Sequence, residues 1–510
     1  MFRLNCSRLD SPLLHMLLLL GTTFLVYGFS LQHQFLSSWD DNLYVTRNLD
    51  AQGFTLEHLR AAFSTFYVGN YAPLQIISYM FDYTFWPNNP AGYIGANIVI
   101  HALNGLLFYR LVAKLTASYR LALFSSFIFL LHPVQVESVV WISQRKNVLA
   151  MFFFLVSLLS YIGYRRNEAR RRHTCYAVAL FTFLCALLTK SVVVVLPVVL
   201  VLYDFCFAPQ KNRSQWIVDK LPFVAAAVAV ALITLKSQAA GAGGGMVNYP
   251  DESAFGIFIT MLTVFASYAR MLVWPTKLSI FYYTPVKTAV DLPVILSAIL
   301  MILLGAGLAY LFRKDKRTFF WAALIPVGIL PVSQIIPLST MMNDRYLYFP
   351  LLGFAVLVVI GADYCFDRFL PGKQAAASTL LCLMLLPLPI LSWERSTVWY
   401  DSLSIWSDAL DKSPNFVTYA GMGNALYKAN RLDDAIYMYN QALRLEPTCE
   451  EALRSLSAIY LNAGEYNKAA YYINLFVQNY PDNPLGQQLM DTVNQQLNMQ
   501  RLPVSTQNRP

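Results

Sequence analysis

Two adjacent carboxylates are the first residues in this chain that could do chemistry. Asp40 and Asp41 follow Trp39 in a long stretch, 32–93, that lies just beyond an apolar run near the N-terminus. Neighbouring carboxylates raise each other's pKa, and such a group can accept the proton of a hydroxyl that acts as a nucleophile. Aspartate is also favoured at the N-cap of a helix. From the dipeptide alone, the N-cap is the favoured interpretation and the general base is the alternative.

Three polar residues share one face of a later apolar segment. Asn97, His101 and Asn104 are spaced i, i+4, i+7, which places them on one side of a helix. Polar residues in a membrane helix face the bundle interior or a cavity. We expect an interhelical hydrogen bond from Asn104, and we take Asn97 and His101 as candidate substrate-binding residues. His101 has no partner at metal-ligand spacing.

Four basic residues are candidates to bind an anionic group. Arg145 and Lys146 follow Glu137 in a short loop, and Lys190 and Arg345 lie at the ends of other apolar segments. Arginine and lysine bind the phosphate of a lipid head group. Taken singly, each is better explained as a snorkelling anchor or a salt bridge, for instance Glu137 with Arg145. Because all four are expected on one side of the membrane, we predict a shared site that also includes Glu137.

The composition indicates which elements position these residues. Of the 510 residues, 56% are hydrophobic and only 13% are charged, whereas soluble proteins carry about a quarter charged residues. Disorder and a wholly soluble protein are therefore excluded. The net charge of +9 is spread through short loops rather than gathered on one exposed face, so we expect no nucleic-acid partner.

Apolar runs long enough to cross about 30 Å of hydrocarbon recur through the first 392 residues. We expect eleven spans, at roughly 13–31, 94–112, 118–134, 147–164, 174–189, 191–207, 217–236, 292–312, 318–336, 347–364 and 375–392. The first is expected to be retained, since no small-residue cleavage site follows it. The segment 255–274 is also apolar, and we assign it as an interfacial or partly inserted helix.

The basic residues predict the orientation. With the N-terminus in the cytoplasm, 19 Lys and Arg residues lie on the inner side, against 10 on the outer side up to residue 392. Eleven crossings then place the C-terminal part outside the cytoplasm. A twelfth crossing at 255–274 would reverse this and would put the basic run Arg313–Arg317 outside.

The C-terminal part, 393–510, is polar and has a period of about 34 residues. Small and large residues recur at the positions typical of a tetratricopeptide repeat, from Phe416 to Pro447 and again from Leu453 to Pro481. This predicts stacked helix pairs after a membrane domain at 1–392. Such repeats present a surface for a protein partner, and a structural cap on the membrane domain is an equally good interpretation.

The cysteines and glycines predict no cofactor. The seven cysteines lack zinc-type or CxxC spacing, so we expect neither a metal site nor a disulfide framework. The glycine-rich stretch 241–245 lacks the Lys-Ser/Thr ending of a phosphate-binding loop, and we interpret it as a flexible connector.

The motifs taken together resemble a known family. They are Trp39-Asp40-Asp41, Asn70-Tyr71-Ala72-Pro73-Leu74, Asn89-Pro90-Ala91-Gly92-Tyr93, His132-Pro133, Arg145-Lys146, Lys190-Ser191 and Asn343-Asp344-Arg345-Tyr346. In this order they are similar to bacterial membrane proteins with tetratricopeptide tails, which look like relatives of the TMTC O-mannosyltransferases. The resemblance implies an all-α polytopic bundle of GT-C type in a bacterial inner membrane. It also implies a polyprenyl-phosphate sugar donor and an active site on the extracytoplasmic face.

The resemblance also implies roles for residues. The acidic pair of the first external loop supplies the catalytic base in that family, so the role falls on Asp40 or Asp41, and we favour Asp40. Asn147 stands where an acidic residue is common, and Tyr71 replaces a usual tryptophan, which puts the detailed substrate specificity in doubt. The implied reaction is an inverting transfer of a sugar to a hydroxyl of a protein or glycan acceptor.

Two other classes of function fit parts of the sequence. A membrane-anchored scaffold for envelope or secretion assembly would use the repeats to bind a partner. A transporter of lipid-linked glycans would use the same basic residues. The scaffold gives no account of the carboxylates and cations, and transfer of a labelled sugar by the purified protein would separate the enzyme from both alternatives.

Overall fold

The computed structural model describes residues 11–166, 171–208, 213–240, 253–338, 340–369 and 374–501. Within these ranges the chain is helical, and the only β-type pairing is an isolated bridge between Tyr67 and Asn70. The chain divides into two compact units. The first holds residues up to Leu36 and from Asp40 to Tyr400, and the second holds Ser37–Trp39 and the chain from Asp401 onward. The predicted all-α class is confirmed.

The first unit contains seven helices of the described chain that are long and apolar enough to cross a membrane. They are Pro12–Gln32 (α1 and a short 3-10 turn), Pro90–Thr116 (α4), Ile142–Arg166 (α7), Trp216–Gln238 (within α10 and α11), Ala254–Val273 (α12), Leu292–Lys314 (α13) and Ala376–Thr397 (α16 and α17). The bent pair Tyr119–Leu131 (α5) and Pro133–Val140 would be an eighth.

This count is lower than the eleven spans expected, because four of the apolar runs form bent or short helices and a fifth, at 347–364, is a helix with three charged residues near its C-terminal end. Five expected spans are affected. The run 118–134 bends by 53° after Leu131, where Pro133 follows. The runs 174–189 and 191–207 are the shorter helices α8 (Arg172–Leu187) and α9 (Leu196–Phe207). The runs 318–336 and 347–364 correspond to α14 (Lys316–Ile329) and α15 (Leu351–Phe369).

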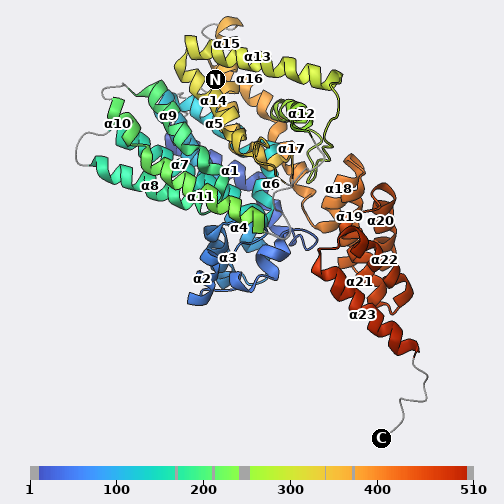
Figure 1. Ribbon diagram of the computed structural model, residues 1–510. Helices are drawn as coiled ribbons and strands as arrows, with labels where there is room; N and C mark the ends of the chain where they lie inside the picture. Colours follow the sequence, from blue (N-terminus) through green and yellow to red (C-terminus); the bar gives the residue numbers. More distant parts are fainter. Residues whose placement is uncertain are drawn as a thin grey trace, which may run out of the picture. The chain divides into compact units, whose positions relative to one another are not determined.

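Helix α12 is long and apolar enough to be a span, although the sequence favoured an interfacial helix. Figure 1 shows it nearly end-on, whereas α8, α11 and α13 lie across the view. After α12 the chain returns along it, since the backbone N–H of Lys287 donates to Thr260 Oγ1 (2.9 Å). The assignment of α12 as an interfacial helix stays a prediction.

The long segment between α1 and α4 folds on the bundle as short helices. Its elements are a π-helical turn (Asn42–Thr46), a 3-10 turn (Leu49–Ala51), α2 (Leu56–Ser64) and α3 (Pro73–Phe85), and α2 and α3 lie together at one end of the unit (Figure 1). The hydroxyl of Thr55 caps α2 by accepting from the His58 N–H (3.0 Å). These elements bring Asp40 and Asp41 against the loops that connect α5 to α7.

Close helix packing forms the core of the membrane unit. A Cβ at Gly105 of α4 would lie 2.5 Å from the Leu130 side chain of α5. A Cβ at Gly353 of α15 would meet the carbonyl oxygen of Trp321 in α14. Small residues let helix backbones approach in this way, and dispersion contacts then hold the pair. Helix α17 (Pro387–Thr397) also belongs here, since Ser392, Arg395 and Ser396 are buried in it, so this unit extends past the expected boundary at 392.

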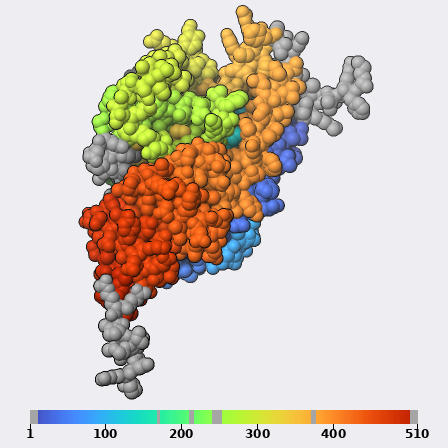
Figure 2. Space-filling view, turned by 90° about the vertical axis from the view of Figure 1, so that its right-hand side faces the viewer, coloured from blue at the N-terminus to red at the C-terminus, as the bar shows by residue number. Residues whose placement is uncertain are grey.

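The second unit is a stack of helices, drawn in dark orange to red in Figure 2. They are α18 (Ser402–Lys412), α19 (Phe416–Lys428), α20 (Leu432–Leu445), α21 (Glu450–Asn462), α22 (Tyr466–Asn479) and α23 (Pro484–Arg501). Gly423 packs against Tyr439, and a Cβ there would lie 2.7 Å from the ring. Trp39 packs edge-to-face on Trp406 with ring centroids 5.0 Å apart. The predicted tetratricopeptide repeats are confirmed.

Candidate active site

The Asp41 carboxylate is buried, and both of its oxygens accept hydrogen bonds. Its carboxylate accepts from the backbone N–H of Leu36 (2.9 Å), from Trp141 Nε1 (3.0 Å), and from both the backbone N–H (3.1 Å) and the hydroxyl of Ser143. Burial raises the pKa of Asp41 to about 6, and the hydrogen bonds from Ser143 and Leu36 oppose that shift. Asp41 therefore fastens the segment between α1 and α4 to the segment between α6 (Val136–Val140) and α7.

Asp40 has a different environment. Its carboxylate is half-buried and makes no hydrogen bond or ion pair with any residue that the structure describes. Its backbone carbonyl accepts from Leu43 (2.9 Å) and Tyr44 (3.1 Å). Burial raises the pKa of Asp40 above its usual value, while the positive charges of Lys146 and Arg345 act to lower it. Asp41 stands at the N-cap of the π-helical turn, as the N-cap interpretation expected, but its side chain makes no capping hydrogen bond and Asp40 contributes only its carbonyl.

Lys146 is held beside Asp40 by Tyr44. Its Nζ lies 3.2 Å from the Tyr44 hydroxyl and 4.8 Å from the centre of the Tyr44 ring. The Tyr44 hydroxyl also accepts from Asn70 Nδ2 (3.2 Å). A cation over an aromatic face is stabilised by the ring quadrupole, so Tyr44 positions the ammonium group without neutralising it.

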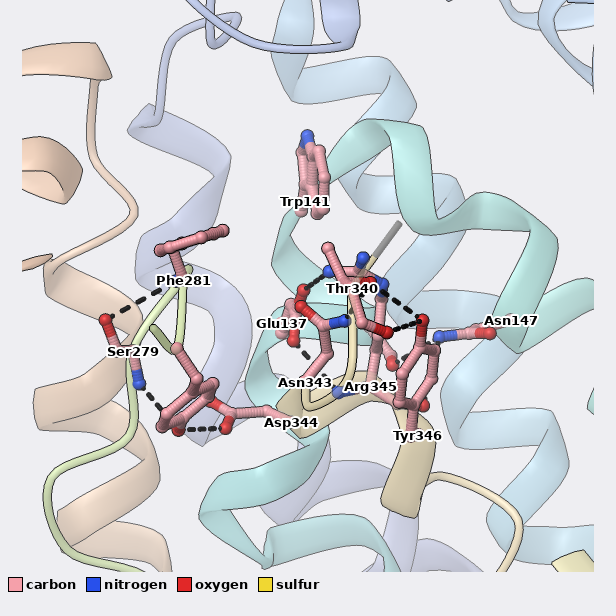
Figure 3. Close-up of polar contacts among 12 residues, drawn as sticks. Glu137, Trp141, Asn147, Ser279, Phe281, Thr340, Asn343, Asp344, Arg345 and Tyr346 are labelled. Carbon is pink, nitrogen blue, oxygen red and sulfur yellow. Dashed lines mark hydrogen bonds and ion pairs between the residues drawn. The ribbon is translucent and has the colours of Figure 1, made fainter. Parts of the chain in front are cut away.

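Arg345 is oriented by Glu137, as the close-up in Figure 3 shows. Arg345 Nη1 lies 2.5 Å from Glu137 Oε1, and the Arg345 backbone N–H donates to Glu137 Oε2 (2.9 Å). Burial acts to lower the pKa of Arg345, but the Glu137 carboxylate more than offsets this and the pKa is raised. The salt bridge expected between Glu137 and Arg145 is therefore wrong, since Glu137 pairs with Arg345.

Lys190 joins the same group of cations. Its Nζ donates to Asn147 Oδ1, and Asn147 Nδ2 donates to Ser138 Oγ (2.8 Å). Burial lowers the pKa of Lys190 well below its usual value, and the charges of Lys146 and Arg345 act in the same direction. Lys146, Lys190 and Arg345 thus lie close enough to repel one another. We call these three residues the cation cluster.

Arg145 lies elsewhere. It is 1% exposed, pairs with Asp82 Oδ2 (2.6 Å) and donates to the Tyr93 carbonyl (2.7 Å) and to Asn97 Oδ1. The structure corrects the expectation that Arg145 contacts an anionic substrate, because its guanidinium is occupied by a buried carboxylate. The sequence showed two adjacent cations, but successive residues of a helix point in different directions.

His101 and Asn97 are structural in the same sense. His101 Nδ1 lies 2.7 Å from the Tyr348 hydroxyl and its Nε2 lies 3.1 Å from the Leu130 carbonyl oxygen, and the ring is fully buried. Asn97 Nδ2 donates to the Trp141 carbonyl (3.2 Å). The expectation that these two line a substrate site is corrected, since both groups are used up in tying α4 to neighbouring elements. Asn104 makes the expected interhelical hydrogen bond, to the Val148 carbonyl (2.8 Å).

Some residues of the site were missed from the sequence. Asp344 accepts from the Tyr282 hydroxyl, and Arg395 Nη2 lies 3.8 Å from Asp344 (Figure 3 shows Asp344). Tyr44 and Asp82 were likewise unassigned. The only signal for Asp344 was its place in the Asn343-Asp344-Arg345 motif, whereas nothing local marks Tyr282 or Asp82. In the described ranges no three His, Cys, Asp or Glu side chains gather as metal ligands.

Comparisons with known proteins agree with this architecture. A family model described as tetratricopeptide repeat matches residues 421–484. The chain is 24% identical over 508 residues to protein O-mannosyl-transferase TMTC1 of Homo sapiens, covering 88% of this chain and 57% of that protein. It is also 24% identical over 396 residues to a protein O-mannosyl-transferase of Caenorhabditis elegans, covering 75% of this chain and 54% of the relative.

The chain spans about half the length of these curated relatives. Among solved structures, it is similar to the Archaeoglobus fulgidus oligosaccharyltransferase, with 10% identity, a TM-score of 0.40, and coverage of 83% of this chain and 58% of the other. This structural similarity is weak, and the conclusions below depend on the sequence relatives and the side-chain geometry. Over most of its length the chain is similar to the TMTC protein O-mannosyl-transferases, and it carries a tetratricopeptide repeat region at its C-terminal end.

Proposed function

We propose that this chain is an integral-membrane glycosyltransferase that moves a sugar from a polyprenyl-phosphate donor to a hydroxyl of a protein acceptor. We place the reaction on the extracytoplasmic face of the membrane, a bacterial inner membrane by the family resemblance, and assign Asp40 as the general base. The named relatives support transfer to proteins. The choice of donor, face and base depends on the family resemblance and on the site geometry.

The observation that carries the proposal is the difference between the two adjacent aspartates. Asp41 accepts four hydrogen bonds and is 1% exposed, so it has no capacity left for a substrate. The Asp40 carboxylate is only partly exposed and makes no hydrogen bond or ion pair with the described chain, and it lies in the field of two cations. A carboxylate with a raised pKa, partly accessible and next to positive charge, is suited to accept a proton.

The proposed step is a single displacement. The acceptor hydroxyl oxygen attacks the anomeric carbon while its proton passes to an Asp40 oxygen. The bond between the anomeric carbon and the phosphate oxygen breaks, and the phosphate leaves with the electron pair. Attack opposite the leaving group inverts the configuration at the anomeric carbon. The phosphate needs no proton from the protein if positive charge stabilises it.

The cation cluster supplies that positive charge. Lys146, Lys190 and Arg345 are fixed by Tyr44, Asn147 and Glu137 respectively. Their positions are set before substrate binds, so little reorganisation is needed when charge develops on the departing phosphate. Their mutual repulsion also favours binding of a phosphate group between them. Arg145 and Asn97 then act as positioning residues, because they hold α3, α4 and α7 together around the site.

The test is the substitution Asp40→Asn in full-length protein reconstituted with a polyprenyl-phosphate sugar and an acceptor peptide containing Ser and Thr. General-base catalysis contributes about 10² to 10⁴-fold, so sugar transfer should fall by that factor. The apparent Tm should stay near that of the parent, because the Asp40 side chain makes no described contact. Transfer at the parental rate would show that the base is wrongly assigned.

Asp41→Asn is the matched control. Asn offers one acceptor oxygen where the carboxylate offers two, and buried donors that lose their partner cost about 1 to 3 kcal/mol each. This variant should therefore lower the apparent Tm, which Asp40→Asn should not. The alternatives are a scaffold or a lipid-linked glycan transporter. A scaffold predicts no transfer by the parent protein, and a transporter predicts movement of the donor across vesicles without a glycosylated peptide.

A further inference from the structure

A second cavity lies far from Asp40, toward the other end of the membrane helices. Its volume is about 630 Å³, and it is bordered by α1, α4, α7 and α8 together with Tyr119 at the start of α5. On α4 its lining residues Arg110 and Lys114 lie in the last turns, whereas Asn97, which contacts the segment next to Asp41, lies near the start. A helix rises 1.5 Å per residue, so these two ends of α4 are separated by roughly 20 to 25 Å.

The walls of this cavity combine two kinds of surface. Apolar side chains from three helices line one part, namely Met16, Leu107, Val156 and Leu159. Arg110 and Lys114, one turn apart on α4, add positive charge to another part of the lining. The cavity is also fixed in shape on one side, since the lining residue Tyr109 places its hydroxyl 2.9 Å from His15 Nδ1.

A third cation adds to the positive charge. Arg166, at the end of α7, donates from Nη1 to the backbone carbonyl of Lys114 (3.0 Å). Within the part of the chain that the structure describes, Arg110, Lys114 and Arg166 form no ion pair with a carboxylate. Three like charges at the end of a membrane bundle repel one another, and a bound anion would relieve that repulsion.

We propose that this cavity binds an anionic glycerophospholipid, with its phosphate on Arg110 and Lys114 and an acyl chain along Leu107, Val156 and Leu159. A soluble anion would gain nothing from the apolar wall, and a zwitterionic lipid would gain little from the cations. A basic pocket between membrane helices is suited to an acidic lipid head group. The site does not depend on the proposed reaction, because it lies toward the opposite end of α4 from the acid pair.

The experiment measures lipid binding to the full-length protein in detergent by native mass spectrometry, with phosphatidylglycerol and phosphatidylcholine as probes. The parent should bind phosphatidylglycerol preferentially. The double substitution Arg110→Gln/Lys114→Gln should weaken that binding roughly 25-fold, because each basic residue near a membrane contributes about fivefold. The matched control, Arg313→Gln/Lys314→Gln, removes the same charge from exposed positions at the end of α13 and should leave binding unchanged.

A second variant keeps both cations. Ser160 lines the cavity, so Ser160→Phe should fill it and abolish the preference for phosphatidylglycerol. An apparent Tm near the parental value in phosphatidylcholine shows that each variant is folded. Equal binding of the two lipids by the parent would overturn the proposal. So would a polyprenyl phosphate that binds more tightly than phosphatidylglycerol and loses affinity in the Arg110→Gln/Lys114→Gln variant, since the occupant would then be a different lipid.

Discussion

At the residue scale, neighbours in the sequence have opposite tasks. The Asp41 carboxylate accepts four hydrogen bonds, whereas the partly buried Asp40 carboxylate beside it accepts none from the described chain. Arg145 is buried against Asp82, and Lys146 beside it is held over Tyr44. In both pairs one residue builds the local structure and the next presents a charge. The structural member of each pair fixes the backbone from which the functional member projects.

The charge of Lys146 should be visible in the pH dependence of the reaction. The ionised form of Asp40 is the base, so kcat/KM falls as the pH drops below its pKa. The Lys146 ammonium lowers that pKa, and Lys146→Gln should raise it, which moves the acid limb of the profile to higher pH. Sugar transfer measured from pH 4 to 9 tests this. Arg60→Gln, an exposed change in the same loop, should leave the limb in place, and an unshifted limb in Lys146→Gln would contradict the proposed coupling.

Substitutions in the ion pair of Glu137 and Arg345 can distinguish a loss of stability from a loss of sugar transfer. Glu137 is 1% exposed, so Arg345→Met leaves a buried carboxylate without its partner, which costs about 3 to 5 kcal/mol. Glu137→Gln/Arg345→Met removes both charges and should recover most of the apparent Tm. Sugar transfer should stay low in both variants, because the cation that faces the phosphate is absent. Recovery of transfer in the double variant would mean that Arg345 is only structural.

The site illustrates what the sequence can predict at this scale. The acid pair, Lys146, Lys190 and Arg345 were predicted from residue type and order, and the structure brings them together. Arg145, Asn97 and His101 were expected at the same site and are instead buried structural groups. A buried ion pair such as that of Arg145 with Asp82 joins residues 63 positions apart, and no local pattern indicates which partner a cation takes.

At the element scale, breaks in apolar runs decide what each helix does. The bend after Leu131 places Glu137 at the site, and the break between α8 and α9 places Lys190 there. Hydropathy predicted apolar segments at these positions but treated them as uninterrupted spans. The breaks come from single residues, such as Pro133 and the polar pair Thr189-Lys190, whose effect depends on whether neighbouring elements satisfy the freed backbone groups. These breaks reduce the number of long helices, and they also position Glu137 and Lys190 at the site.

The contact of α15 with α14 gives a test of helix packing. A Cβ at Gly353 would meet the Trp321 carbonyl oxygen, and backbone atoms cannot move aside cheaply. Gly353→Ala should destabilise the membrane unit by about 1 to 3 kcal/mol. Gly361, in the same helix, has nothing within 4 Å of a built Cβ, and Gly361→Ala should be neutral or slightly stabilising. Apparent Tm values of the two purified variants test this prediction. Equal values would show that α14 and α15 can move apart at Gly353 without a loss of stability.

At the scale of the whole molecule, composition predicted two kinds of unit and the structure has them. The apolar content required a membrane bundle, and the 34-residue period required stacked helix pairs. The exact boundary was harder to predict, because α17 carries polar residues from Glu394 onward while it is still packed in the bundle. Ser37–Trp39, far from the repeats in sequence, joins the repeat unit through Trp406, and a long-range contact of this kind has no signature in a single sequence.

With the other expected crossings kept, α12 decides on which side of the membrane the later parts of the chain lie. If α12 lies in the interface, the external loop and the repeats are on the same side of the membrane and the end of α13 is on the other. We expect a cysteine-free variant carrying Arg60→Cys or Arg431→Cys to react with an impermeant maleimide in intact cells. Arg313→Cys should react only after permeabilisation. If α12 crosses the membrane, the results for Arg313→Cys and Arg431→Cys are reversed, because both residues follow α12 and one more crossing moves each to the opposite side. Reaction of Arg313→Cys but not of Arg431→Cys in intact cells would therefore put the repeats in the cytoplasm, where they could not act on an acceptor presented to Asp40.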